Sequence, residues 1–315
     1  MADQPKQLTD AKTFQKPTAQ LAETLSEKVR REGPAYLRGP SFIVDDLQTM
    51  IRHAIATFKL LCYLNADERR TQDPYWDNSY GVVTAPLVRS MIDCLYNITM
   101  ILEDPAQYGP RYRKSGLKRR LLDIEEDQAT YAGKPEWDSY NEEQIKALDW
   151  LIRGDRFTME EIRKSSPWMT LGKYLSQGKP EAATPHQKFL KTFTHMQWRQ
   201  YSALSHATFE GYIGDIPTGV YFLTDRLPLD QRERPDEIYG LFVSRHIGRA
   251  AVILLSLATE LQLHFRFDGA DINNRLRKMW KALTGFFEAD ELYRGRYRDL
   301  MVERGLMSGA ERDES

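Results

Sequence analysis

The chain has 315 residues, of which 41% are hydrophobic and 28% charged, and its net charge at pH 7 is −1. These values are typical of a globular protein with a substantial core, and they exclude a disordered chain or one whose overall charge attracts nucleic acid. The polar N-terminus lacks the apolar run of a secretory signal, and no apolar stretch is long enough to span a bilayer. We therefore expect a cytoplasmic protein with no membrane partner.

The first third of the chain predicts a tail and three helices. Residues 1–17 are polar and predict a flexible N-terminal tail, and residues 18–32 predict a short helix that ends at a Gly-Pro pair. Apolar side chains then recur every three or four positions from about 41 to 65, the period of an amphipathic helix. The next helix, 84–103, is apolar over most of its circumference, so we expect other helices to surround it.

Helical periodicity continues to the C-terminus, and alternating strand patterns are almost absent, apart from a short candidate at Val220–Leu223. The remaining helices are expected at 108–132, 136–153, 158–164, 167–177, 186–212, 236–266, 271–288 and 289–305. We predict an all-α fold, a single multi-helix bundle with long central helices that spans residues 18–308. A C-terminal tail is expected at 309–315.

One predicted helix carries an aligned row of polar side chains. Spacings of four, three, four and four residues place five of them on one face: His195, Arg199, Ser202, His206 and Glu210. Arg199 and His206, two turns apart, could meet one phosphodiester, since arginine binds phosphate oxygens and histidine exchanges protons near neutral pH. Ser202 or Tyr201 could orient a substrate, although Tyr201 projects from a different side. The same row would also suit the solvent face of an ordinary amphipathic helix.

Two further helices carry polar rows on otherwise apolar surfaces. Arg89, Asp93 and Asn97 line up on the helix at 84–103, and Arg245, Arg249, Ser256 and Glu260 line up on the helix at 236–266. If the rows face one another, Arg89, Asp93 and Arg249 would support Arg199 and His206 inside a polar seam. The alternative is that Arg89 and Asp93 form a structural ion pair that holds the bundle in register.

Other chemistry is weakly represented. The segment RYRKSGLKRR at 111–120 is a local basic patch that could bind RNA, but the acidic DIEED that follows could compensate its charge. Cys62 and Cys94 lie in apolar helical patterns and have neither metal-site nor disulfide spacing. No Glu-x-x-His pair, P-loop or dinucleotide-binding turn occurs, so no metal or cofactor is predicted.

Two stretches resemble a known bacterial family. LVRSMIDCLYNITMILEDPAQYGPRY is similar to the central helix of DUF5677-type proteins, where an R-S-x-x-[ED] pattern precedes an apolar run and a basic, tyrosine-rich helix. RQYSALSHATFEGY resembles the family's later Y-x-x-L-S-x-x-x-H segment, except that here the histidine directly follows the second serine. The resemblance covers roughly residues 80–215 and implies an all-helical protein without an established activity.

The R-x6-H spacing of Arg199 and His206 also resembles the R-x(4–6)-H signature of HEPN domains, helical ribonucleases of toxin and phage-defence systems. The polar residue that follows the arginine in that signature is Gln200 here. This resemblance implies a metal-independent ribonuclease with Arg199 and His206 as the catalytic pair, and a homodimer by analogy. The alternative is a non-enzymatic binding or regulatory module whose polar seam is structural or holds an anion.

Overall fold

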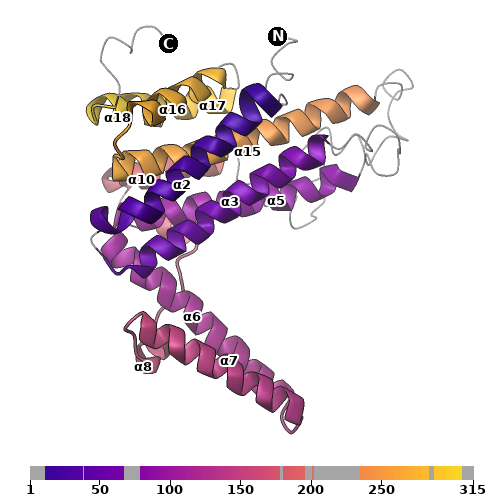
Figure 1. The fold of residues 1–315 in the computed structure, drawn as a ribbon, viewed down its shortest axis with the longest axis vertical. Helices are drawn as coiled ribbons and strands as arrows, with labels where there is room; N and C mark the ends of the chain where they lie inside the picture. Colours follow the sequence, from indigo (N-terminus) through magenta and orange to yellow (C-terminus); the bar gives the residue numbers. More distant parts are fainter. Residues whose placement is uncertain are drawn as a thin grey trace.

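The predicted all-α class is confirmed by a computed structural model of the chain (Figure 1). The structure describes the following residues: 11–37, 39–66, 79–177, 180–195, 201, 235–283 and 287–306. Within these ranges the regular elements are all helical. The candidate strand at 220–223 and the tail at 309–315 lie outside the described residues.

Four long helices form the main bundle: α2 (Lys16–Tyr36), α3 (Phe42–Ala66), α5 (Ser79–Glu103) and α15 (Pro235–Phe265). A π-helical turn, η1 (Ala11–Gln15), precedes α2. The N-terminal tail is therefore shorter than predicted, because residues 11–17 are helical and the apolar ring of Phe14 is buried in the core. Helix α2 also continues past the Gly-Pro pair, since Pro34 lies in its last turn and withdraws only one backbone donor near the helix end.

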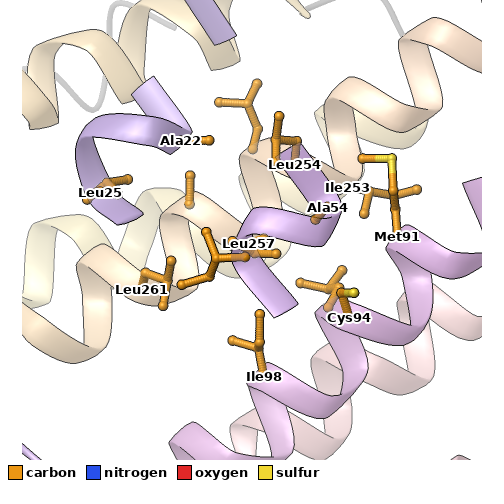
Figure 2. Close-up of a cluster of buried hydrophobic side chains, with 14 of the residues drawn as sticks. Ala22, Leu25, Ala54, Met91, Cys94, Ile98, Ile253, Leu254, Leu257 and Leu261 are labelled. Carbon is orange, nitrogen blue, oxygen red and sulfur yellow. The ribbon is translucent and has the colours of Figure 1, made fainter. Parts of the chain in front are cut away.

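Helix α15 occupies the centre of the bundle. Every residue from 246 to 263 is buried, and the helix packs against α2, α3 and α5. Figure 2 shows side chains from these helices meeting around α15: Ala22, Leu25, Ala54, Met91, Cys94, Ile98, Ile253, Leu254, Leu257 and Leu261. The wide apolar arc of α5 predicted that other helices would pack around it. Helix α5 indeed packs against α3, α6, α10 and α15.

A helical hairpin projects from the bundle (Figure 1). It consists of the second half of α6 (Pro105–Thr130), α7 (Pro135–Gly154) and the short α8 (Met159–Lys164), and we call residues 117–164 the arm. The arm has an apolar cluster of its own, made by Leu117, Leu121, Ile124, Leu148, Ile152 and Ile162. The predicted single bundle is thus a main core with a second, smaller core beside it.

The joint between the arm and the bundle is ionic. Arg113 of α6 donates to Asp46 of α3 over 2.7 Å and to Asp155, the residue after α7, over 2.6 Å. The guanidinium also lies 5.7 Å from the ring centre of Phe42. One arginine therefore connects the first helix of the arm to both the bundle and the end of α7.

Shorter elements complete the described fold: α9 (Leu171–Leu175), η3 (Pro180–Ala182), α10 (Pro185–Phe193), α16 (Ala270–Ala282), α17 (Phe287–Leu292), η6 (Tyr293–Tyr297) and α18 (Arg298–Glu303). A capping box begins α10, because Thr184 accepts from the backbone N–H of Gln187 and the Gln187 side chain accepts from that of Thr184. Among the described helices, none is both long and apolar enough to cross a membrane.

Candidate functional site

Only part of the predicted site lies in the described structure. Arg199, Ser202 and His206 fall outside the described residues, as do Glu210 and the side chain of Arg245. The supporting residues Arg89, Asp93, Tyr201 and Arg249 are described. Whether the three polar rows face one another therefore stays a prediction, and the structure gives the surroundings of these four residues.

Two contacts define the direction of the chain that carries the first row. His186 Nε2 lies 3.9 Å from Glu260 Oε2 near the C-terminal end of α15, and Tyr201 Oη lies 2.6 Å from His246 Nδ1 in the first half of this helix. His186 comes before Tyr201 in sequence, but its partner Glu260 comes after His246 on α15. The chain therefore passes from His186 to Tyr201 in the direction opposite to α15.

Tyr201, His246 and Arg249 form a buried group that we call the Tyr201 cluster. Tyr201 is fully buried, and its hydroxyl shares a hydrogen bond with the His246 ring. The Arg249 guanidinium lies 5.6 Å from the Tyr201 ring centre, a cation–π distance, and Arg249 is only 1% exposed. The structure thus brings the predicted supporting residues Tyr201 and Arg249 together. It adds His246, which the sequence pattern does not single out because its partner Tyr201 is 45 residues away.

Arg89 and Asp93 form the ion pair that their i, i+4 spacing predicted. Burial raises the pKa of the Asp93 carboxyl, and the charge of Arg89 opposes this shift. The pair is not fully enclosed, since the Arg89 side chain is 20% exposed and that of Asp93 is 50% exposed. It differs in this respect from the Tyr201 cluster.

The Arg89–Asp93 face of α5 points towards the segment that carries Tyr201. Tyr96 shares this face, and its hydroxyl lies 3.1 Å from Thr194 Oγ1, just past the end of α10. Arg89 lies seven residues before Tyr96 on this face, a helical rise of about 10 Å.

Glu260, which lines up with Arg249 in the third polar row, has other partners than the Tyr201 cluster. It is 2% exposed and accepts two hydrogen bonds from Arg296, from Nε over 3.0 Å and from Nη2 over 3.1 Å. His186 lies beside the pair, and we call these three residues the Glu260 cluster. A buried carboxylate on an apolar helix requires a positive charge beside it. Glu260 was therefore the sequence signal for a cationic partner, and the structure identifies this partner as Arg296.

The Glu260 cluster is compensated within the chain. Arg296 also lies 5.5 Å from the ring centre of Phe189, and it lines a groove of about 370 Å³ beside that ring. Burial lowers the pKa of His186, and the charge of Glu260 opposes the shift. Burial also lowers the pKa of the nearby His264, to about 4, so this ring is uncharged at neutral pH. The cluster has the features of a structural ion pair.

The basic segment at 111–120 is largely compensated as well. Arg113 is bound by Asp46 and Asp155, and the other pairs are Lys114–Glu161 at 3.1 Å and Arg119–Asp123 at 3.0 Å. Lys118 donates to the Ser165 carbonyl over 2.6 Å. Internal partners thus occupy most of the cations that were predicted as a local RNA-binding patch.

Metal-binding and thiol chemistry find no support in the described ranges. No group of three or more His, Cys, Asp or Glu side chains lies close enough there to hold a metal ion. Cys62 and Cys94 are free thiols, and burial raises the pKa of each to about 12, which keeps them protonated. The Tyr201 cluster is therefore the best candidate site among the described residues. Comparisons of the chain with protein-family models, curated proteins and solved structures gave no match.

Proposed function

We propose that this protein is a HEPN-like, metal-independent ribonuclease of the toxin or defence type, with Arg199 and His206 as its catalytic residues. The observation that supports the proposal is the Tyr201 cluster. Tyr201 lies between the two residues in sequence, and its ring is held against Arg249 of α15. Because Tyr201 projects from a different side of the predicted helix, its contact with α15 would leave the side that carries Arg199 and His206 open to a substrate.

The reaction would be cleavage of RNA by its own 2′-hydroxyl. That oxygen attacks the adjacent phosphorus, the bond to the 5′-oxygen breaks, and the products are a 2′,3′-cyclic phosphate and a 5′-hydroxyl end. His206 would take the proton from the 2′-hydroxyl or return one to the leaving oxygen, and Arg199 would neutralise the phosphate oxygens.

A second candidate is a non-enzymatic binding or regulatory module. It is favoured by the internal partners of the two supporting arginines, since Asp93 binds Arg89 and the Tyr201 ring covers Arg249. In that case the polar seam either maintains the helix register or holds a small anion. The two candidates differ in what happens to RNA when the chain is expressed.

The test is expression in bacteria of the wild type, Arg199→Ala and His206→Ala at matched soluble levels, with growth and total RNA followed over time. His195→Ala is the matched control, because His195 is exposed and belongs to the same predicted row. The ribonuclease proposal expects growth arrest and RNA cleavage with the wild type and His195→Ala, and neither with the two catalytic variants. Intact RNA in all four cultures would refute it.

Purified protein separates catalysis from folding. Wild type should cleave RNA in excess EDTA and leave 2′,3′-cyclic phosphate ends, because no metal takes part. The circular dichroism and melting temperature of His206→Ala should match those of wild type. If the variants instead lose their helical signal or solubility, Arg199 and His206 are needed for folding. The non-enzymatic candidate then replaces the ribonuclease.

A further inference from the structure

The outer face of α7 is unusually apolar for a helix at the surface. Trp150 is 74% exposed, and Tyr140 and Leu151 are 45% and 38% exposed. These three account for nearly half of the large hydrophobic side chains that are exposed in the described residues, and all lie on one helix of the arm. An apolar stripe of this kind usually marks an interaction surface.

The stripe has the spacing of a helix-packing seam. Six exposed residues recur every four and three positions along α7: Glu136, Tyr140, Glu143, Ala147, Trp150 and Gly154. Alternating steps of four and three residues place side chains along one face, as at the a and d positions of a coiled coil. The opposite face of α7, with Leu148 and Ile152, is already buried in the arm's own core. The outer seam is thus available for a second helix.

Small residues in the seam would let another helix approach closely. Ala147 lies at the middle of the stripe, and Gly154 lies at its end with open space around its Cα. In an antiparallel pairing centred on Ala147, each residue meets the one equally far on the other side of the centre. Tyr140 would then lie over Gly154 of the second helix, where there is room for its ring, and Glu143 would lie over Leu151.

The charges on α7 favour the same antiparallel pairing. The first half of the helix is acidic, with Glu136, Asp138, Glu142 and Glu143, whereas the second half carries Lys146 and Arg153 with Asp149 as its one carboxylate. A parallel pair would place acidic halves together. An antiparallel pair places the acidic half of each helix beside the basic end of the other, with Glu143 near Arg153.

We propose that α7 is a self-association surface, on which α7 of a second copy of this chain packs antiparallel about a two-fold axis near Ala147. Such an interface is isologous, so each contact occurs twice. A helix of 20 residues is about 30 Å long, and one helix pair buries less than a standard interface of about 1,600 Å². We therefore expect a dimer with a dissociation constant in the micromolar range. The proposal does not depend on the ribonuclease activity, because the arm lies outside the Tyr201 cluster.

The first test is sedimentation velocity of the full chain at concentrations from about 1 to 200 µM. Wild type should shift from monomer to dimer across this range, and Trp150→Glu should stay monomeric. Leu122→Ser is the matched control, because Leu122 is 46% exposed on α6 but lies outside the seam, and it should dimerise as wild type does. A monomeric wild type at every concentration, or a Trp150→Glu variant that still dimerises, would overturn the proposal.

A charge swap tests the antiparallel geometry. Glu143→Lys and Arg153→Glu should each weaken self-association by about tenfold or more, because like charges then meet at both ends of the seam. An equimolar mixture should restore dimers, since both ends of the mixed pair carry opposite charges. Failure of the mixture to associate more tightly than either variant alone would refute the pairing. Circular dichroism of both variants checks that the arm remains helical.

Discussion

The role of the Glu260 cluster as a structural ion pair can be tested at Arg296. We consider Arg296→Met, which keeps much of the side-chain volume but removes the guanidinium. The carboxylate of Glu260 then loses two hydrogen bonds of 3.0 and 3.1 Å in a position that is only 2% exposed. His186, 3.9 Å away, has a pKa lowered chiefly by burial, so it is a poor replacement for the missing cation.

The expected loss of stability is large. Removal of one partner from a buried ion pair costs about 3–5 kcal/mol, because a charge is left without compensation. Loss of the contact between Arg296 and the Phe189 ring adds up to about 1 kcal/mol. A free-energy change of about 4 kcal/mol corresponds to a drop in melting temperature on the order of 10 °C for a chain of this size.

The assay is urea unfolding followed by circular dichroism, with Arg294→Met as the matched control. Arg294 lies in the same turn and pairs with Asp290 at 3.0 Å, but its side chain is 57% exposed, so its loss should cost less than about 1 kcal/mol. The double variant Glu260→Leu, Arg296→Met should recover most of the loss, because no buried charge remains. Equal stability of Arg296→Met and Arg294→Met would refute the reasoning.

Two further perturbations follow from the geometry. Burial raises the pKa of Asp46 to about 6, and the charge of Arg113 opposes this shift. The folded protein therefore holds the Asp46 proton more tightly than the unfolded chain, and the stability that this provides is lost as pH rises from about 4 through 6. Urea unfolding should therefore show Asp46→Asn gaining about 2 kcal/mol relative to wild type between pH 4 and 7.5, and an equal difference at both pH values would contradict the raised pKa. In α6, a Cβ added at Gly109 would meet Ile43 at 2.6 Å, so Gly109→Ala should lower the melting temperature by an overpacking cost of about 1–3 kcal/mol. Gly116→Ala, with open space around it in the same helix, should raise the melting temperature by a gain of about 0.5–1 kcal/mol; a gain at Gly109 would contradict the close packing of α6 on α3.

Local patterns predicted the helices well because the relevant information lies within a few residues. The wide apolar arc of α5 correctly indicated a helix with several neighbours, and the i, i+4 spacing of Arg89 and Asp93 correctly predicted their ion pair. The tail was predicted too long because Phe14 is a single apolar residue in a polar stretch. Its burial depends on the packing of η1 and α2 rather than on a local period.

Long-range partners could not be predicted in the same way. Glu260 lines up with Arg249 on one helix, yet its counter-charge comes from Arg296, 36 residues later, in a segment whose arginines resemble a surface patch. Arg113 similarly does not add its charge to the expected basic patch, because it forms an ion pair with Asp46, 67 residues earlier. Helical periodicity assigns a residue to a face but does not identify the neighbouring helix. His246 was missed for this reason, because its partner Tyr201 is 45 residues away.

The central position of α15 has a consequence for how the chain is made. Its partners α2, α3 and α5 leave the ribosome first, but α15 begins only at residue 235 and its buried stretch ends at 263. Until then, the apolar faces that will enclose it have no native partner. Nascent chains should therefore be clients of chaperones over most of their synthesis, and a product truncated before α15 should be insoluble or quickly degraded. The main core is therefore completed late in translation, because α15 is the last of its four helices to be synthesised.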